Sequence, residues 1–246
     1  MSEDMMCFGS RVVLIAPHPD DVAYSIGGLA AKLARYTTLE LVTVFARSAW
    51  AVPRALRHAG FKTITAVRQK EDLNFCHRLG MRLHTLDFAD SSLSGYDAVS
   101  ERESRYSNDP RPARVLESLS RLLTNVAPDM VLAPAAIGGH VDHRIVRDVV
   151  RRMNVRNWRI AFYEDLPYAA EFSLASLTAA LQRDGLRPLR TVNIDTTFNI
   201  KLAALWDYQS QTEHDTADAV VRHAKRLAAT LPRPAPCYVE RIWEQA

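Results

Sequence analysis

The sequence predicts a three-layer α/β fold in which helices cover both faces of a mostly parallel sheet. Three observations indicate this. Strand-like and helix-like segments alternate along the chain, and that order favours a parallel sheet with crossover helices. The first strand-like segment, Arg11–Ala16, is a continuous apolar run, as expected for a strand buried on both faces. With 246 residues, 48% of them hydrophobic, the chain can bury a sizeable core.

The elements follow from hydrophobic periodicity taken in chain order. After Arg11–Ala16, apolar residues at helical spacing predict a helix over residues 21–36. Gly80, a typical helix stop, ends the next predicted helix. Further strands are expected at residues 39–46, 82–88, 129–135, 158–162 and 190–194, and further helices at 65–79, 114–126, 142–153, 197–211 and 215–230. This order is Rossmann-like, and it places a ligand site at the carboxyl ends of the strands.

Composition excludes several classes of protein. A net charge of only +3 excludes general disorder, and the short apolar runs exclude a spanning helix. The start, residues 1–4, is acidic and unlike the basic start of a secretory signal. Three widely spaced cysteines, Cys7, Cys76 and Cys237, favour thiols in a reducing compartment. We therefore expect a cytoplasmic protein without a membrane partner.

The basic residues cluster in one segment. Their near-helical spacing indicates a solvated helix face, and no interleaved aromatic residues or nucleic-acid motif accompany them. We therefore expect no nucleic-acid partner. The cluster consists of Arg144, Arg147, Arg151, Arg152, Arg156 and Arg159.

Two clusters of histidine and aspartate follow the first and fourth predicted strands. Residues 17–21 are Pro-His-Pro-Asp-Asp, and residues 138–143 are Gly-Gly-His-Val-Asp-His. Because parallel strands end at a common edge, the two clusters are expected to meet although they lie far apart in sequence.

His18, Asp21 and His143 would together supply two imidazoles and one carboxylate. A catalytic zinc ion typically has three such protein ligands and one open position, and ferrous iron suits the same set. The tandem Asp20 and Asp21 have an alternative interpretation, since aspartate at a helix start caps the helix and suits its dipole.

These motifs resemble those of the LmbE-like (PIG-L) zinc-dependent N-deacetylases. The resemblance rests on the two clusters, on Gly27-Gly28 after the first, and on residues 208–211, which are similar to the family's Tyr-x-Ser-Gln. It implies that residues 1–246 form a single deacetylase domain with the C-terminal helices, about 197–230, packed on it. It also implies removal of an acetyl or other acyl group from an N-acetylglucosamine-type sugar or glycoconjugate. The chain has Val22 where many members have glutamate, which concerns the subfamily.

Carried over by position, the resemblance makes His18, Asp21 and His143 the zinc ligands. Asp20 becomes the general base. His140 becomes the residue that stabilises the tetrahedral intermediate or protonates the leaving amine, with Asp142 as its partner.

Three further residues are candidates for substrate binding. Arg68 and Asp90 resemble family positions that hold sugar hydroxyls, although Arg68 could instead pair with Glu71 or Asp72 at the surface, and Asp90 could form a turn. Trp50 is either a core residue or a stacking surface for a sugar or aglycone. The long polar segment 89–112 and the segment 47–62 are expected to border the site.

The sequence alone is also compatible with other functions. A metal-dependent phosphoesterase also uses Asp and His ligands, usually around two metals, whereas the sequence offers ligands for one. A non-catalytic sugar-binding protein would not require Asp20. Nucleotide-dependent oxidoreduction is disfavoured because no Gly-x-Gly-x-x-Gly follows the first strand. The expected partner is a small-molecule sugar or glycoside, and a homo-oligomer is compatible with the sequence.

Overall fold

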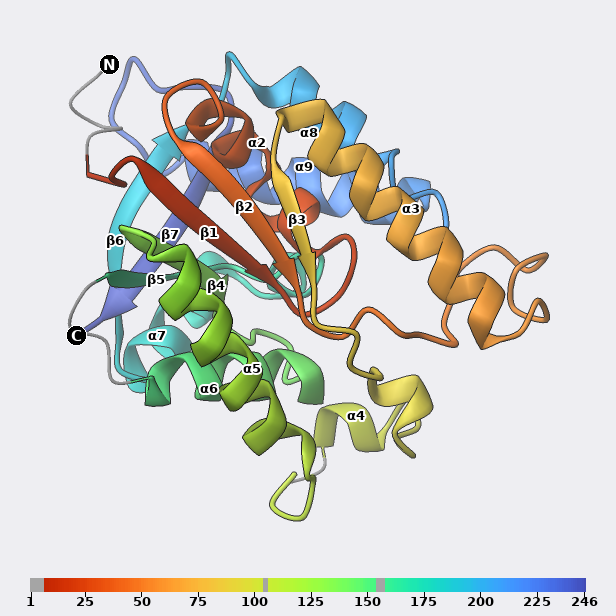
Figure 1. Cartoon of the computed structure of the whole chain (residues 1–246). Coiled ribbons are helices and arrows are strands. Elements are labelled where there is room, and N and C mark those ends of the chain that lie inside the picture. Colours follow the sequence, from red (N-terminus) through yellow and green to blue (C-terminus); the bar gives the residue numbers. More distant parts are fainter. Residues whose placement is uncertain (1–6, 104–105, 154–157) are drawn as a thin grey trace.

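A seven-stranded sheet forms the middle layer of this computed structural model, within the residues that the structure describes, 7–103, 106–153 and 158–246 (Figure 1). The strand order is β3-β2-β1-β4-β5-β7-β6, and within it only β7 runs antiparallel to its neighbours. The strands are β1 (Arg11–Ala16), β2 (Thr38–Thr43), β3 (Arg82–Thr85), β4 (Met130–Pro134), β5 (Arg159–Tyr163), β6 (Leu186–Asn193) and β7 (Val239–Gln245). The predicted α/β fold with a mostly parallel sheet is confirmed.

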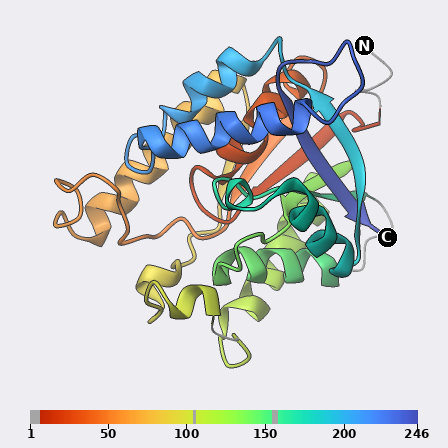
Figure 2. The same cartoon turned by 180° about the vertical axis from the view of Figure 1, so that it is seen from behind.

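Helices form the two outer layers (Figures 1 and 2). One face carries α2 (Asp21–Leu33), α3 (Phe61–Leu79), α8 (Phe198–Leu205) and α9 (His214–Ala228). The other carries α5 (Arg111–Val126), α6 (Val141–Arg152) and α7 (Leu174–Arg183). The short elements η1 (Ser91–Leu93), α4 (Ser100–Glu103) and η2 (Tyr168–Glu171) lie in the loops.

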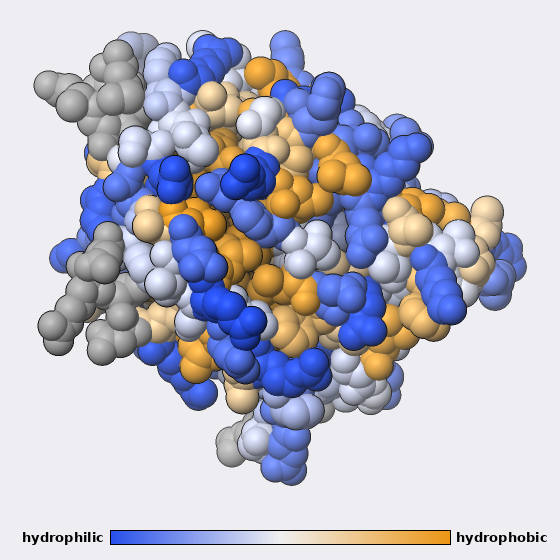
Figure 3. Space-filling view, in the orientation of Figure 1, coloured by the Kyte–Doolittle hydropathy of each residue, from blue (hydrophilic) through white to orange (hydrophobic). Residues whose placement is uncertain are grey.

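The core lies between the sheet and both helix layers. Val12, Leu14 and Ile15 of β1 have no exposed surface, and every residue of β4 is buried. These runs are apolar because both faces of a central parallel strand are covered. Figure 3 shows hydrophilic residues over most of the visible surface, with a band of hydrophobic residues between α3 and α5.

Some predicted elements change length or are added. The helix expected at 197–211 ends at Leu205, and the last parallel strand, β6, already starts at Leu186. The sequence prediction omitted α7 and β7. In β7 the acidic Glu240 is buried, which hydropathy alone disfavours, because Lys201 of α8 neutralises it across a 2.5 Å contact between Lys201 Nζ and Glu240 Oε1.

Four residues of the arginine cluster lie on helix α6 as predicted, Arg144, Arg147, Arg151 and Arg152, whereas Arg159 begins strand β5. Helix α6 buries Ile145, Val146 and Val149, while Arg147 and Arg151 both form ion pairs with Asp184. Residue Arg156 of this cluster and residues 1–4 lie outside the described residues. Among the described helices, none combines the length and the apolar character that a membrane span requires.

The strand order fixes where a site can form. The direction in which successive strands are added to the sheet reverses between β1 and β4. These two strands pair in parallel, with Val12 beside Met130 and Leu14 beside Leu132. The loops that follow these two strands therefore open at the same edge of the sheet, the position that ligands occupy in such folds.

Candidate active site

The two predicted histidine–aspartate clusters meet at this edge. The ring centres of His18 and His143 are 5.2 Å apart, although 125 positions separate the residues in sequence. Asp21, in the first turn of α2, lies between them: one carboxylate oxygen is 3.4 Å from His18 Nδ1, and the other is 3.4 Å from His143 Nε2. All three side chains are buried.

The donor atoms of His18, Asp21 and His143 fit a divalent cation. Ligand atoms about 2.1 Å from a tetrahedral ion lie about 3.4 Å from one another, which is the spacing of both contacts to Asp21. In addition, His143 Nε2 is fully buried and has no hydrogen-bond partner among the described residues. A buried nitrogen without a partner is costly unless a ligand engages it.

The electrostatics of the site also favour a cation. Burial lowers the pKa of His18, but hydrogen bonds to Asp142 and Asp21, together with their charges, raise it to about 10. These carboxylates therefore create a strongly negative potential at His18, which a metal ion would neutralise in place of a proton.

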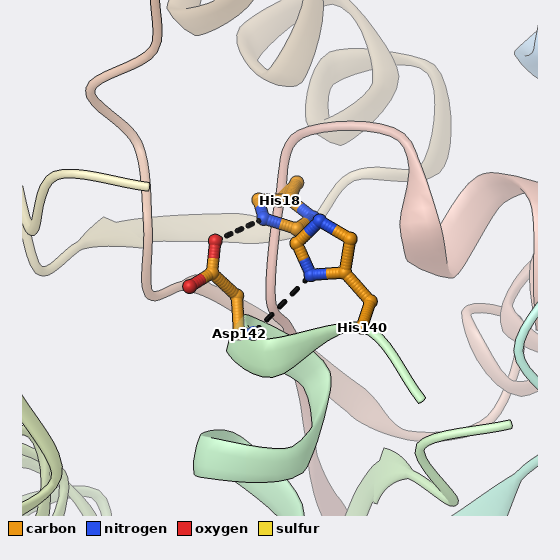
Figure 4. Close-up of side chains that lie close together, drawn as sticks. All are labelled: His18, His140 and Asp142. Carbon is orange, nitrogen blue, oxygen red and sulfur yellow. Dashed lines mark hydrogen bonds and ion pairs between the residues drawn. The ribbon is translucent and has the colours of Figure 1, made fainter. Parts of the chain in front are cut away.

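A second group of possible ligands, His18, His140 and Asp142, also clusters here. In this group, however, His18 Nε2 is 2.9 Å from Asp142 Oδ2, the length of a hydrogen bond (Figure 4). Both groups also share His18. The geometry therefore favours the set with Asp21, with Asp142 orienting His18 through its second nitrogen.

His140 lies beside this set and is oriented by the backbone. As the N-cap of α6, its Nδ1 accepts a hydrogen bond from the backbone N–H of Asp142 at 3.2 Å, so Nε2 carries the ring proton in this arrangement (Figure 4). Burial lowers the pKa of His140, and the charges of His18 and His143 add to this effect, while Glu101 opposes it.

Asp142, the expected partner of His140, acts on its ring through charge: burial lowers the pKa of His140 and the Asp142 carboxylate opposes this, while the hydrogen bond to the ring comes from the Asp142 backbone N–H. The Asp142 carboxylate bonds His18, the guanidinium of Arg111 at 2.8 Å and the backbone N–H of Ser91. The acid nearest to the His140 ring is Glu101, 3.5 Å from Nε2. The physical reason is that the capping geometry brings the Asp142 amide, and not its carboxylate, to the ring.

Asp20 adjoins the ligand set in a strained backbone conformation, with φ of 114°. Although it is the residue before α2, its side chain makes no capping hydrogen bond, so the capping alternative is not supported for Asp20. Burial and the charge of Asp21 raise its pKa to about 8, while Arg68, 3.9 Å away, and His18 oppose this shift. A cation bound beside Asp20 would act in the same direction as Arg68 and His18 and favour the ionised carboxylate.

The ligand set opens into a cavity of about 480 Å³ that also contains the three predicted substrate-binding residues. Arg68 is buried and bonds the Pro19 carbonyl at 3.1 Å, so the surface ion-pair alternative is wrong. Trp50 is 55% exposed at the cavity, which excludes the core alternative. Asp90 lines the cavity and also accepts a hydrogen bond from Ser92 within its turn, so its turn interpretation is confirmed and its substrate-binding role stays a prediction.

Comparison with known proteins decides the family. The family model described as "GlcNAc-PI de-N-acetylase" (PIG-L) matches residues 13–154. The 2'-N-acetylparomamine deacetylase of Streptomyces fradiae is 38% identical over 252 residues, covering 96% of this chain and 90% of that protein. This chain belongs to the PIG-L family.

Two solved structures extend the similarity of this PIG-L chain to the whole fold. An A40926 pseudoaglycone deacetylase shares 26% identity with a TM-score of 0.72 and covers 96% of each chain. A deacetylase of teicoplanin biosynthesis shares 25% identity with a TM-score of 0.74, over 95% of this chain and 97% of that one. The PIG-L chain is accordingly an N-deacetylase, a hydrolase of N-acetyl amides.

Two residues of the PIG-L site were not among the individual site residues predicted from sequence. Asp165, directly after β5, lies with Oδ1 2.7 Å from Nδ1 of His143, and both residues are fully buried. Arg111 pairs with Asp142 from the start of α5. The rule that ligands gather at the carboxyl ends of parallel strands does indicate residues 163–168, at and after the end of β5, which include Asp165, but not a role for Asp165 itself; no sequence signal marks Arg111.

Proposed function

We propose that this chain is a divalent-metal-dependent N-deacetylase that removes the acetyl group from an N-acetylglucosamine-type sugar within a small glycoconjugate. Zinc is the proposed metal, with ferrous iron as the alternative, because two imidazoles and one carboxylate suit both. The observation that carries the proposal is the convergence of His18, Asp21 and His143, with the carboxylate of Asp20 beside them.

The relatives support this class of substrate. The Streptomyces fradiae protein is named for an N-acetylated paromamine, and the two structural neighbours are named for the antimicrobial A40926 pseudoaglycone and for teicoplanin biosynthesis. A cavity of about 480 Å³ suits a sugar ring with part of its aglycone.

His18, Asp21 and His143 would hold the metal. When bound, it would lower the pKa of a water molecule and polarise the acyl carbonyl. Asp20 then accepts the proton of that water as its oxygen forms a bond to the acyl carbon. The carbonyl π electrons move onto the acyl oxygen, and His140 donates a hydrogen bond from Nε2 to this oxyanion.

The tetrahedral intermediate collapses when the acyl oxygen re-forms its double bond and the C–N bond breaks. The electron pair of that bond remains on nitrogen, which takes the proton held by Asp20. The products are the free amine and the carboxylic acid, and the acid then gives its proton to the solvent to become the carboxylate, so atoms and charges balance. One carboxylate thus serves first as base and then as acid.

Arg68, Asp90 and Trp50 are proposed to hold the sugar. Arg68 is the strongest of the three because its guanidinium is buried, lines the cavity, and leaves Nε without a partner among the described residues. Trp50 offers an exposed ring to a sugar or aglycone. A phosphoesterase is less well supported because the second ligand group shares His18 and gives no independent second metal site.

We also propose that the chain forms one domain and resides in the cytoplasm. The first proposal is supported by the single sheet, in which β7 and β6 add to the edge of the parallel strands next to β5. The second rests on the thiols of Cys76 and Cys237, which form no disulfide.

The test is an assay of acetate and free amine formed from a panel of N-acetylated amino-sugar glycosides, 2'-N-acetylparomamine among them. The purified protein should release one acetate per amine formed, lose activity with a chelator, and regain it with zinc or ferrous iron. Turnover that a chelator leaves unchanged, with no metal found by elemental analysis, would contradict the metal-dependent mechanism.

A further inference from the structure

One tyrosine on the cavity wall has no role in the mechanism above. Tyr168 begins η2, directly after the loop that contains Asp165, and it lines the cavity together with His18 and His140. Its ring centre is 5.5 Å from that of His143 in an edge-on contact, and 6.4 Å from that of His140. Tyr168 therefore neighbours both the histidine that would bind the metal and the one that would stabilise the oxyanion.

The position of the Tyr168 ring is closely fixed by its surroundings. A Cβ atom added to Gly138 would lie 2.7 Å from Cβ and 2.8 Å from Cγ of Tyr168. The loop that leads to His140 can therefore lie this close to Tyr168 only because residue 138 is glycine. The guanidinium carbon of Arg102 lies 5.2 Å from the ring centre on the ring face. Such fixation limits reorganisation when a substrate binds.

The hydroxyl of Tyr168, by contrast, has no hydrogen-bond partner among the described residues. It is also not sealed in the interior, since it is absent from the fully buried atoms that lack partners. For comparison, the hydroxyl of Tyr24, another cavity residue, bonds Thr212 at 2.6 Å. Tyr168 therefore offers to the cavity that it lines a polar group that no described residue engages.

The phenol remains protonated at neutral pH. An ordinary phenol has a pKa of about 10, and burial raises that of Tyr168. The hydroxyl is thus available as a donor and not as a base.

We infer that Tyr168 is a further catalytic residue, whose hydroxyl donates a hydrogen bond to the acyl oxygen of the bound substrate as that oxygen becomes an oxyanion. This inference rests on the proposed function. The phenol transfers no proton, so the proton balance through Asp20 is unchanged. The oxyanion would then receive hydrogen bonds from His140 and from Tyr168, which are fixed by different loops.

Two other roles for Tyr168 make different predictions. If Tyr168 only packs against Gly138 and His143, removal of its hydroxyl has no effect on turnover. If the hydroxyl binds a sugar hydroxyl group in the ground state, its removal raises KM and leaves kcat unchanged. An oxyanion donor acts in the transition state, so its loss lowers kcat with little effect on KM.

The experiment is Tyr168→Phe, which keeps the ring and its contacts and breaks no hydrogen bond between described residues. We expect kcat for acetate release from 2'-N-acetylparomamine to fall about 10²-fold, with KM little changed. A methylphosphonamidate analogue of the acetamide, which mimics the tetrahedral intermediate, should bind about 10²-fold more weakly to the variant. Metal content, measured on both proteins, should be equal.

Tyr238→Phe is the matched control. Tyr238 also has a stacked ring, against Phe198 at 3.4 Å between ring centres, and a cation near its face, but it lies outside the cavity. Its kcat should equal that of the wild type. An unchanged kcat for Tyr168→Phe, or an effect on KM alone, would overturn the inference while wild-type turnover upholds the proposed function. A wild type that releases no acetate from any panel member would overturn both.

Discussion

His143 and Asp165 form a completely buried pair, with Nδ1 of the histidine 2.7 Å from Oδ1 of the aspartate. The other carboxylate oxygen accepts the backbone N–H of Ile137 at 3.0 Å. The pair thus joins the end of β5 to the loop after β4. Because the carboxylate holds the Nδ1 proton, the lone pair of Nε2 faces Asp21 and the proposed metal.

Asp165→Asn should weaken metal binding. The amide keeps the shape of the side chain but removes the charge that orients His143 and increases its basicity. We expect the Kd for zinc, measured by competition with a chromophoric chelator, to rise about 10–100-fold. Asp207→Asn, at an ion pair with Arg78 outside the cavity, is the control and should leave the Kd unchanged. Equal affinity of the Asp165 variant and the wild type would show that this pair does not tune the metal.

Asp20→Asn should abolish most turnover while metal stays bound. Asparagine tolerates the positive φ of this position, so the backbone is preserved, but the amide cannot accept the proton of the attacking water. We expect kcat to fall about 10²–10⁴-fold, with the metal content unchanged by elemental analysis. Asp87→Asn is the control, since Asp87 also has a positive φ but lies outside the cavity. Full activity of the Asp20 variant would remove this residue as the base.

Arg68→Met should weaken substrate binding. It removes donors from the cavity, and each hydrogen bond to a charged group contributes about 1.5 kcal/mol, or about tenfold in affinity. We therefore expect KM to rise at least about tenfold in steady-state kinetics. Arg78→Met is the control on the same helix, because Arg78 bonds Asp207 away from the cavity. If KM is unchanged and only kcat falls, Arg68 acts through Asp20 and does not bind the substrate.

Glu164 should contribute acid-sensitive stability. Burial raises its pKa, but the hydrogen bond to His223 and the charge of Arg241 outweigh this and hold the pKa below its usual value. The contribution is therefore complete above the unfolded pKa of about 4.3, and it is lost as the pH falls through the folded pKa. Glu164→Gln should cost about 3 kcal/mol at pH 7, because it leaves Arg241 without its buried partner.

Urea unfolding between pH 7 and pH 3 would measure this contribution. The difference in unfolding free energy between wild type and Glu164→Gln should shrink as the pH falls below about 4.3. Glu117→Gln, at an exposed ion pair with Arg121, should show almost no difference at any pH. A Glu164 difference that stays constant with pH would show that its ionisation does not stabilise the fold.

The central strands of the fold could be predicted because their sequence pattern is local. The segment Arg11–Ala16 is apolar throughout and forms β1 with the predicted bounds. Strand β7 could not be predicted in the same way. Its buried Glu240 is stable only because Lys201 of α8 and the backbone N–H groups of Gly28 and Leu29 of α2 contact the carboxylate. These partners lie far away in sequence, so the pattern of β7 alone does not show that the strand is buried.

The sequence by itself determined the chemical groups of the site. The three proposed ligands, His18, Asp21 and His143, lie just after predicted parallel strands or in the first turn of the next helices. The carboxyl ends of parallel strands meet at one edge of the sheet, so these residues are brought together whatever the side-chain details. Tertiary structure decided how these groups are held. The Asp142 carboxylate bonds His18 and not the His140 ring, Asp165 reaches His143, and the Tyr168 hydroxyl has no partner in the described part of the chain. The reason is that hydrogen-bond partners depend on positions within about 3 Å, set by helix caps and loop packing, whereas strand order fixes only which loops meet.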